Sequence, residues 1–207
     1  MPRIDSLATS LPAHRCDQSD VRNEMARVCR GDRAMERLLP VFDRIGVDTR
    51  YFVRPPEWYS EGQPFETRNA VYATSALELS EKAARACLDR SGTSPDTIDH
   101  IYFVTTTGLM TPSLDARLAS RLGLRPDVRR LPLFGLGCAA GAGALVRAAD
   151  TLRAYPTHRA LVISVELCSL VFSPAARTAT DLVGAALFGD GAAAVVVAGD
   201  ETGGEGP

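Results

Sequence analysis

Cys138 is the residue of this chain whose setting best suits a nucleophile. It follows a short apolar stretch at 131–134 and a turn with Gly135 and Gly137, and it directly precedes a run of very small residues. This pattern predicts a strand, a sharp turn and the first turn of a helix. The unpaired N–H groups and the positive dipole end of a helix start favour the thiolate, which is the nucleophilic form of cysteine.

The helix predicted after Cys138 is unusually apolar. No polar side chain occurs from Ala139 to Val146. A helix that is apolar on all sides is expected to be buried on all sides, and its glycines and alanines permit close contact with other backbones. The sequence therefore predicts that Cys138 lies at the bottom of a tunnel. The alternative for any single cysteine is a buried structural thiol.

Composition excludes several classes of protein. The 207 residues are 45% hydrophobic and 23% charged, and the net charge of −2 predicts no basic surface for nucleic acid or an anionic membrane. No stretch approaches the roughly 18 apolar residues that span a bilayer, and the first residues do not form a signal peptide. The cysteines form no CxxC pair, so neither zinc nor a disulfide framework is expected, and a reduced cytoplasmic enzyme fits best. The five are Cys16, Cys29, Cys87, Cys138 and Cys168.

The elements that must position Cys138 alternate between strands and helices. This alternation is typical of an α/β fold with a mostly parallel sheet. Residues 54–64 are predicted to form a loop, and the helix at 34–45 is expected to bend or break at Pro40. Strands are predicted at 3–10, 49–53, 99–105, 129–134, 160–166 and 192–198, and helices at 17–29, 34–45, 67–90, 113–122, 138–155 and 178–188.

Several separate motifs occur in the order and spacing of a known family. They are the cysteine turn LPLFGLGCAAGAG, the segment SVELCSLVFSP and the run DLVGAALFGDGAAAVVV, supported by FDRIGVDTRYF, PFETRNAVY, TTTGLMTPS and LGLRPDVRRLP. Together they closely resemble the bacterial type III polyketide synthases, the chalcone synthase-like group of the thiolase superfamily. The resemblance implies thiolase-like αβαβα layers. Residues 1–200 would be the amino-terminal domain, and residues 201–207 a linker toward a carboxy-terminal half.

The resemblance also implies an activity. The protein would be a homodimeric synthase that uses neither a metal nor another cofactor, with acyl-CoA and malonyl-CoA as substrates. An acyl-CoA starter would be loaded onto Cys138 and extended with malonyl-CoA by decarboxylative condensation. Cyclisation would then give a pyrone, a resorcinol or another aromatic ring. An aliphatic starter, giving an alkylpyrone or alkylresorcinol, is the favoured prediction.

Further site residues follow from the resemblance by position. Phe188 matches the phenylalanine that gates the CoA tunnel, and Thr111 matches a residue that enters the partner's cavity across the dimer interface. Arg37 and Arg44, seven residues apart on one predicted helix face, match two basic positions that meet CoA phosphates, whereas Pro40 occupies a third. Taken without the resemblance, the same residues would be read as core, local backbone contacts or solvated charges. The acyl cavity would be lined by Thr106, Thr107, Glu166, Cys168 and Leu170.

The chain departs from the family pattern in one respect. The family supplies a histidine and an asparagine from its second half, and these stabilise the thiolate and the enolate oxygen formed on decarboxylation. We interpret His14, His100 and His158 as surface or structural residues, and Asn23 and Asn69 lie on early predicted helices. In the thiolase fold the helix after the cysteine packs between two sheets. We therefore expect this chain to expose an apolar patch and to be inactive alone, as a truncated or split enzyme.

Two other functions remain open at this point. A ketoacyl-carrier-protein synthase III relative would share the fold and the nucleophile but would take malonyl groups from a carrier protein. The residues around Cys138 and the run ALFGDGAAAVVV favour the polyketide synthase. A non-catalytic thiolase-fold fragment, serving dimerisation or CoA binding, would explain the missing histidine and asparagine. The reactivity of Cys138 toward an alkylating reagent distinguishes the last alternative.

Overall fold

The structure is a computed structural model that describes residues 1–175 and 178–203. These residues form two compact units. The first unit contains Met1–Ser10, Ala73–Glu166 and the residues from Ala192 onward, and the second contains Leu11–Tyr72 and Leu167–Gly191. Each unit is described by itself below.

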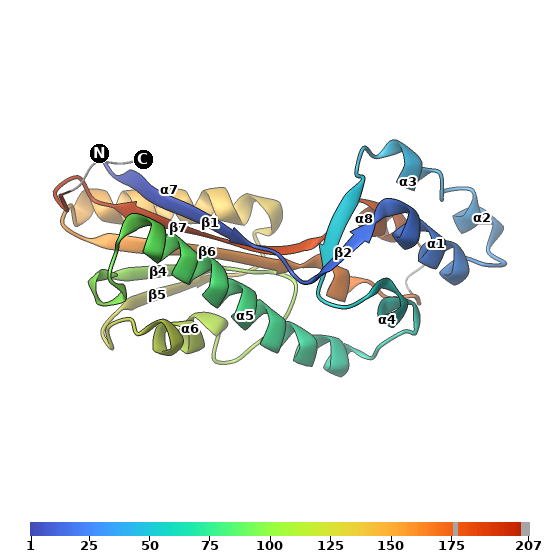
Figure 1. Cartoon of the computed structure of the whole chain (residues 1–207), viewed down its shortest axis with the longest axis horizontal. Helices are drawn as coiled ribbons and strands as arrows, with labels where there is room; N and C mark the ends of the chain where they lie inside the picture. Colours follow the sequence, from blue (N-terminus) through green and yellow to red (C-terminus); the bar gives the residue numbers. More distant parts are fainter. Residues whose placement is uncertain (176–177, 204–207) are drawn as a thin grey trace. The chain divides into compact units, whose positions relative to one another are not determined.

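A five-stranded sheet forms the centre of the first unit (Figure 1). Strand β4 is parallel to both β5 and β6, whereas β1 is antiparallel to β7. The predicted α/β class is confirmed, and the sheet is mixed because β1 and β7 pair antiparallel, from Arg3 opposite Ala198 to Ser10 opposite Ala192. The order is β1-β7-β6-β4-β5, with β1 Arg3–Ser10, β4 His100–Val104, β5 Arg129–Leu133, β6 Arg159–Leu167 and β7 Asp190–Ala198.

Helix α7 (Ala140–Ala154) packs on one face of this sheet, and α5 (Phe65–Ser91) and α6 (Leu114–Leu122) lie on the other (Figure 1). The buried stripe of α7 consists of residues spaced by four, Ala140, Ala144, Ala148 and Leu152, all 0% exposed. The small side chains of the three alanines let the helix approach the apolar strand residues closely. Val146, on the same helix, is 58% exposed. The prediction that this helix is buried on every side therefore fails for the described residues, which leave the face opposite the sheet uncovered, as expected where the second layer of the thiolase fold is not supplied.

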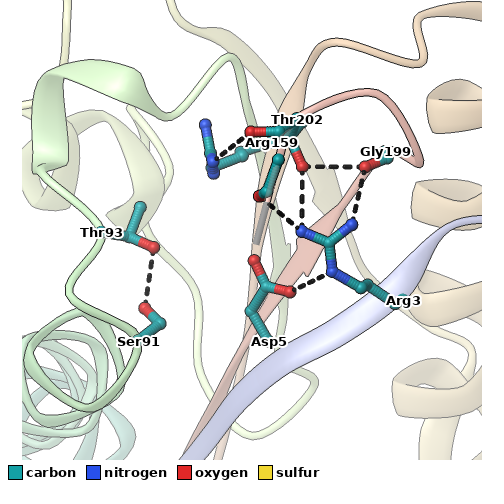
Figure 2. A network of polar contacts seen from close by, with 8 residues as sticks. Arg3, Asp5, Ser91, Thr93, Arg159, Gly199 and Thr202 are labelled. Carbon is teal, nitrogen blue, oxygen red and sulfur yellow. Dashed lines mark hydrogen bonds and ion pairs between the residues drawn. The ribbon is translucent and has the colours of Figure 1, made fainter. Parts of the chain in front are cut away.

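Two arginines fasten the segment after β7 to the sheet (Figure 2). Arg3 forms an ion pair with Asp5 at 3.0 Å and donates hydrogen bonds to Thr202 Oγ1 and the Gly203 carbonyl at 3.2 and 2.8 Å. Arg159 donates to the Thr202 carbonyl at 3.0 Å. The predicted linker at 201–207 thus begins with residues tied to the sheet, and its last four residues lie outside the described ranges.

Gly199 lies where the chain passes the Pro156 backbone. A Cβ at this position would be 2.1 Å from the Pro156 carbonyl oxygen and 2.5 Å from its carbonyl carbon. Gly199→Ala should therefore lower the free energy of unfolding by about 1–3 kcal/mol, measured by urea denaturation. The matched control is Gly141→Ala in α7, where the new Cβ has no atom within 4 Å apart from its chain neighbours and the nearby backbone of its own helix. That variant should gain about 0.5–1 kcal/mol, and equal effects of the two would contradict the contact.

The second unit contains a two-stranded antiparallel ladder, β2 (His14–Asp17) with β3 (Thr49–Phe52), and a set of short helices. Residues 34–45 form two helices rather than one, and Pro40 is the N-cap residue of the second. The interruption predicted at Pro40 is confirmed. Strand β2 and helix α4 were not predicted. The helices are α1 Gln18–Val28, α2 Arg33–Glu36, α3 Val41–Arg44, α4 Pro56–Ser60 and α8 Ala179–Leu187.

Three short 3₁₀ turns complete the described elements. They are η1 (Pro95–Thr97), η2 (Gly137–Ala139) and η3 (Cys168–Val171). Within the described ranges, no helix combines the length and the apolar character that crossing a membrane requires.

Candidate functional site

Cys138 lies in the strand–turn–helix structure that its sequence predicts. Strand β5 ends at Leu133, η2 contains Cys138, and α7 starts at Ala140. Gly135 and Gly137 have φ angles of 84° and 55°, a backbone conformation that favours glycine, and this explains both residues of the turn. The thiol itself is exposed. Among the described residues no second layer encloses Cys138, so the tunnel around it stays a prediction that depends on such a layer.

The other four thiols are less accessible than that of Cys138. Cys16, Cys29 and Cys87 are buried, and Cys168 is partly exposed. Burial raises the pKa of the Cys16 and Cys87 thiols, and Cys87 Sγ also lies 2.9 Å from Ser6 Oγ. All five cysteines lie in the described ranges, so Cys138 is the thiol that a dissolved reagent reaches most easily.

Apolar side chains are exposed on each of the three elements around Cys138. They are Leu131 on β5, Phe134 and Leu136 in the turn, and Val146 on α7, between 43% and 60% exposed. We call these four residues the elbow patch. Its exposure agrees with the expectation that a covering layer is needed over this part of the fold.

Three of the predicted cavity residues meet at one edge of the sheet. Glu166, near the end of β6, accepts hydrogen bonds from the Thr106 amide at 3.1 Å, the Thr106 hydroxyl at 2.9 Å and the Thr107 hydroxyl at 2.7 Å. Because β4 and β6 are parallel neighbours, their carboxyl ends lie at the same edge. The contacts fix one carboxylate and two hydroxyl groups there. Thr111, joined to Pro112 by a cis peptide bond, lies in the loop before α6.

The remaining cavity residues belong to the second unit. Phe188 directly follows α8, and its amide donates to the Gly184 carbonyl at 3.0 Å. Its ring, 45% exposed, lies against Gly184, where an added Cβ would be 3.8 Å away. Cys168 and Leu170, which were predicted to line the cavity, both lie in η3, where Cys168 is partly exposed and Leu170 is buried.

A buried carboxylate ties the segment after Phe188 to two other segments of the second unit. Asp190 accepts hydrogen bonds from the Ser169 amide at 2.8 Å, the Ser169 hydroxyl at 2.5 Å and the Val53 amide at 2.9 Å. Tyr59 Oη lies 2.7 Å from Ser169 Oγ. Burial raises the pKa of Asp190 to about 6 and also raises the pKa of Tyr59. This role of Asp190 was not predicted, because its partners Ser169 and Val53 lie far away in the sequence.

Arg37 and Arg44 are both exposed in the second unit. Arg37 is the C-cap residue of α2, whereas Arg44 is the last residue of α3. The prediction that they share one helix face is wrong, because the helix ends before Pro40 and a new one starts after it.

The three histidines of the sequence lie apart from the predicted site residues. His14 is exposed on β2. His100 begins β4 and its Nε2 lies 3.0 Å from Nδ1 of His158, which directly precedes β6. The pair is thus at the amino ends of parallel strands, the edge opposite Glu166. Burial lowers the pKa of His100. This location supports a structural role for His100 and His158.

Comparisons with known proteins agree with these features. The N-terminal domain of the chalcone and stilbene synthases matches residues 3–201. A putative chalcone synthase of Bacillus subtilis (strain 168) is 41% identical over 208 residues, which cover 97% of this chain and 57% of that protein. A 1,3,6,8-tetrahydroxynaphthalene synthase of Streptomyces peucetius subsp. caesius is 43% identical over 203 residues, which cover 97% of this chain and 53% of that protein.

A solved structure shows the same fold. The crystal structure of 1,3,6,8-tetrahydroxynaphthalene synthase from Streptomyces coelicolor A3(2), described as a bacterial type III polyketide synthase, superposes with a TM-score of 0.91 at 33% identity. The match covers 98% of this chain and 58% of that one. The predicted thiolase-like amino-terminal fold is confirmed, and the chain spans about half the length of the curated relatives it matches. The chain therefore belongs to the chalcone and stilbene synthases, the type III polyketide synthases, and corresponds to their N-terminal domain.

Proposed function

We propose that Cys138 carries the acyl intermediate of a type III polyketide synthase. The observation that supports this most directly is the exposed thiol in a strand–turn–helix structure, flanked by the uncovered elbow patch. An accessible thiol next to the amino end of a helix suits attack on a thioester, and apolar surface suits an acyl chain. The relatives named above are a putative chalcone synthase and 1,3,6,8-tetrahydroxynaphthalene synthases, one of them described as a bacterial type III polyketide synthase, in agreement with this assignment.

The proposed chemistry is two thioester reactions. The Cys138 thiolate attacks the carbonyl carbon of an acyl-CoA, a new C–S bond forms, and the CoA thiolate leaves. Malonyl-CoA then loses carbon dioxide, and the enolate so formed attacks the acyl-cysteine carbonyl, which releases the Cys138 thiolate. A histidine and an asparagine from a carboxy-terminal half, in the same or a second chain, would stabilise the thiolate and the enolate oxygen. The 207-residue chain alone should therefore not complete condensation.

The other proposed roles follow the positions described above. Phe188 would gate the path to the cavity, and Thr111 would enter the cavity of the partner in a homodimer. The favoured starter is an aliphatic acyl-CoA, and the favoured products are alkylpyrones or alkylresorcinols. The acyl cavity would be lined by Thr106, Thr107, Glu166, Cys168 and Leu170.

The test joins residues 1–201 to the carboxy-terminal half of the Bacillus subtilis relative. The joined protein is incubated with malonyl-CoA and acyl-CoA starters of increasing length, and products are identified by mass spectrometry. Triketide or longer products from free malonyl-CoA support the proposal. Activity with malonyl-carrier protein alone would instead indicate a ketoacyl-carrier-protein synthase III-like enzyme. No acylation and no product with any starter would favour a non-catalytic module.

Arg37 and Arg44 offer a separate test of CoA binding. Changing both to glutamine should raise the KM for acyl-CoA in Cys138 acylation about tenfold and leave the maximal rate unchanged, because two charge-assisted contacts to phosphates are removed. Arg27→Gln is the control. Arg27 is an exposed arginine in the last turn of α1 that pairs with Glu24. An equal rise in KM for the control would point to general loss of positive charge.

A further inference from the structure

Arg50 is a buried cation that binds backbone carbonyls at the end of a helix. It lies on β3 and is 5% exposed. Its Nη1 donates to the carbonyl oxygens of Ala185 and Phe188 at 2.5 and 2.8 Å, and its Nη2 donates to Gln18 Oε1 at 2.6 Å. These carbonyls belong to the last turn of α8 and the residue after it, where helical carbonyls lack intrahelical partners. The guanidinium therefore supplies donors that the end of α8 needs.

Gln18 extends the same arrangement. Its Nε2 donates to the Ala186 carbonyl at 2.9 Å, while its Oε1 accepts from Arg50. Three carbonyl groups between Ala185 and Phe188 are thus held by two buried side chains. We call Arg50 and Gln18 the α8 clamp.

Burying a charge costs free energy unless the charge has polar partners, so the guanidinium of Arg50 depends on the acceptors described above. Burial lowers the pKa of Arg50 to about 10, so the group stays a cation near neutral pH. Its guanidinium donates to carbonyls at the negative end of the α8 dipole, and the Asp190 carboxylate also favours its charged form. Arg50 also packs closely on the backbone after Phe188, since a Cβ on Gly189 would lie 3.4 Å from Arg50 Cβ.

These contacts fix the backbone of Phe188, whose ring is partly exposed. The Phe188 amide donates to the Gly184 carbonyl at 3.0 Å, and its carbonyl accepts from Arg50 at 2.8 Å. Both main-chain polar groups of Phe188 are thereby held. The ring rests beside Gly184, which has no side chain to block its rotation.

We propose that Arg50 is the positioning residue for Phe188, and that the α8 clamp sets which acyl chain lengths are admitted past the Phe188 ring. The inference rests on the proposed function, which assigns Phe188 to the gate. A gate discriminates by size only while its backbone is fixed. Loosening residues 185–188 should therefore broaden the range of acyl chains without altering the thiol that reacts.

The experiment compares Arg50→Met, Arg50→Lys and Gln18→Leu with the control Arg15→Met, in the joined protein described above. Arg15 is an exposed arginine of the neighbouring strand β2 and pairs with Asp17. Hydrogen exchange by mass spectrometry reports on the peptide that covers residues 184–190. Acylation of Cys138 by acyl-CoA thioesters of 2 to about 16 carbons, followed by intact mass, reports on selectivity.

In Arg50→Met we expect the backbone amides around Phe188 to exchange hydrogen about tenfold faster, because two hydrogen bonds to that segment are lost. We also expect the ratio of acylation rates between the best and the worst acyl chain to fall about tenfold. Arg50→Lys should restore part of both effects, since an ammonium group still donates to the carbonyls. Gln18→Leu should show a smaller change in the same direction. Arg15→Met should behave as the unaltered protein.

Other results would overturn either the positioning of Phe188 by Arg50 or its effect on the choice of acyl chain. Unchanged exchange in both folded Arg50 variants would show that the clamp does not hold Phe188. Faster exchange with unchanged selectivity would remove the role in choosing acyl chains. If Arg50→Met does not fold, Arg50→Lys and Gln18→Leu decide both readouts. If the unaltered protein is not acylated at all, the proposed function fails, and the exchange data still show whether Arg50 positions the segment.

Discussion

Cys138→Ala should reduce acylation by acyl-CoA by at least about 10⁴-fold, because loss of the nucleophile removes the covalent step entirely. The measurement is the mass of the intact protein after incubation with acyl-CoA, followed by peptide mapping of the modified residue. The strand–turn–helix placement of Cys138 and its exposure are the basis for this expectation.

Cys168→Ala is the matched control for this result. Cys168 is another thiol with some solvent exposure, and the proposal gives it a lining role rather than a covalent one. This variant should retain acylation at Cys138 and change only the preference among starters. Iodoacetamide mapping gives a second readout, in which Cys138 should be alkylated roughly a hundredfold faster than buried Cys87. Acyl groups found on Cys168, or undiminished acylation of Cys138→Ala, would contradict the assigned nucleophile.

The sequence allowed most elements of the first unit to be predicted, because their signals are local. Strand β4 is a continuous apolar run, and the stripe of small residues in α7 repeats every four positions. The turn before Cys138 was predicted for the same reason, from its two glycines, and both have positive φ in the structure. Burial was harder to predict. Whether α7 is covered on its second face depends on a layer that its own residues do not supply.

The missed features of the second unit depend on partners far away in the sequence. Strand β2 has four residues and pairs with β3, where His14 lies opposite Phe52. The bond from Arg50 to Ala185 spans 135 positions, and the bond from Val53 to Asp190 spans 137. One local signal for Arg50 existed. Arg50 and Phe52 are two positions apart on β3, so their side chains face the same side of the strand, which is buried.

Asp190 should make the stability of the second unit depend on pH in an unusual direction. Burial raises its pKa from 3.8 to about 6, so between these values the folded protein binds a proton that the unfolded chain has released. The unfolded state then binds fewer protons, and the free energy of unfolding falls as pH rises from about 4 to 7. A shift of about two units corresponds to about 3 kcal/mol over this range.

The test is the difference in unfolding free energy between the unaltered protein and Asp190→Asn, measured by urea denaturation from pH 4 to 8. Trp58, the one tryptophan of the sequence, lies in the second unit beside Tyr59 and gives the fluorescence signal. The asparagine does not titrate, so the unfolding free energy of the unaltered protein minus that of Asp190→Asn should fall by about 3 kcal/mol as pH rises. Asparagine also leaves one of the donors from Ser169 and Val53 without an acceptor, which adds a loss that does not vary with pH.

His100 is the reason for using a difference between two proteins. Burial lowers its pKa, so below its usual value the unfolded chain binds the proton more tightly and acid destabilises the fold. This effect opposes that of Asp190, and it cancels because both proteins contain His100. A difference that does not vary with pH would show that Asp190 titrates normally. A difference that grows with pH would show that its three hydrogen bonds outweigh burial, and that the carboxylate, rather than the acid, is the form that holds Ser169 and Val53 together.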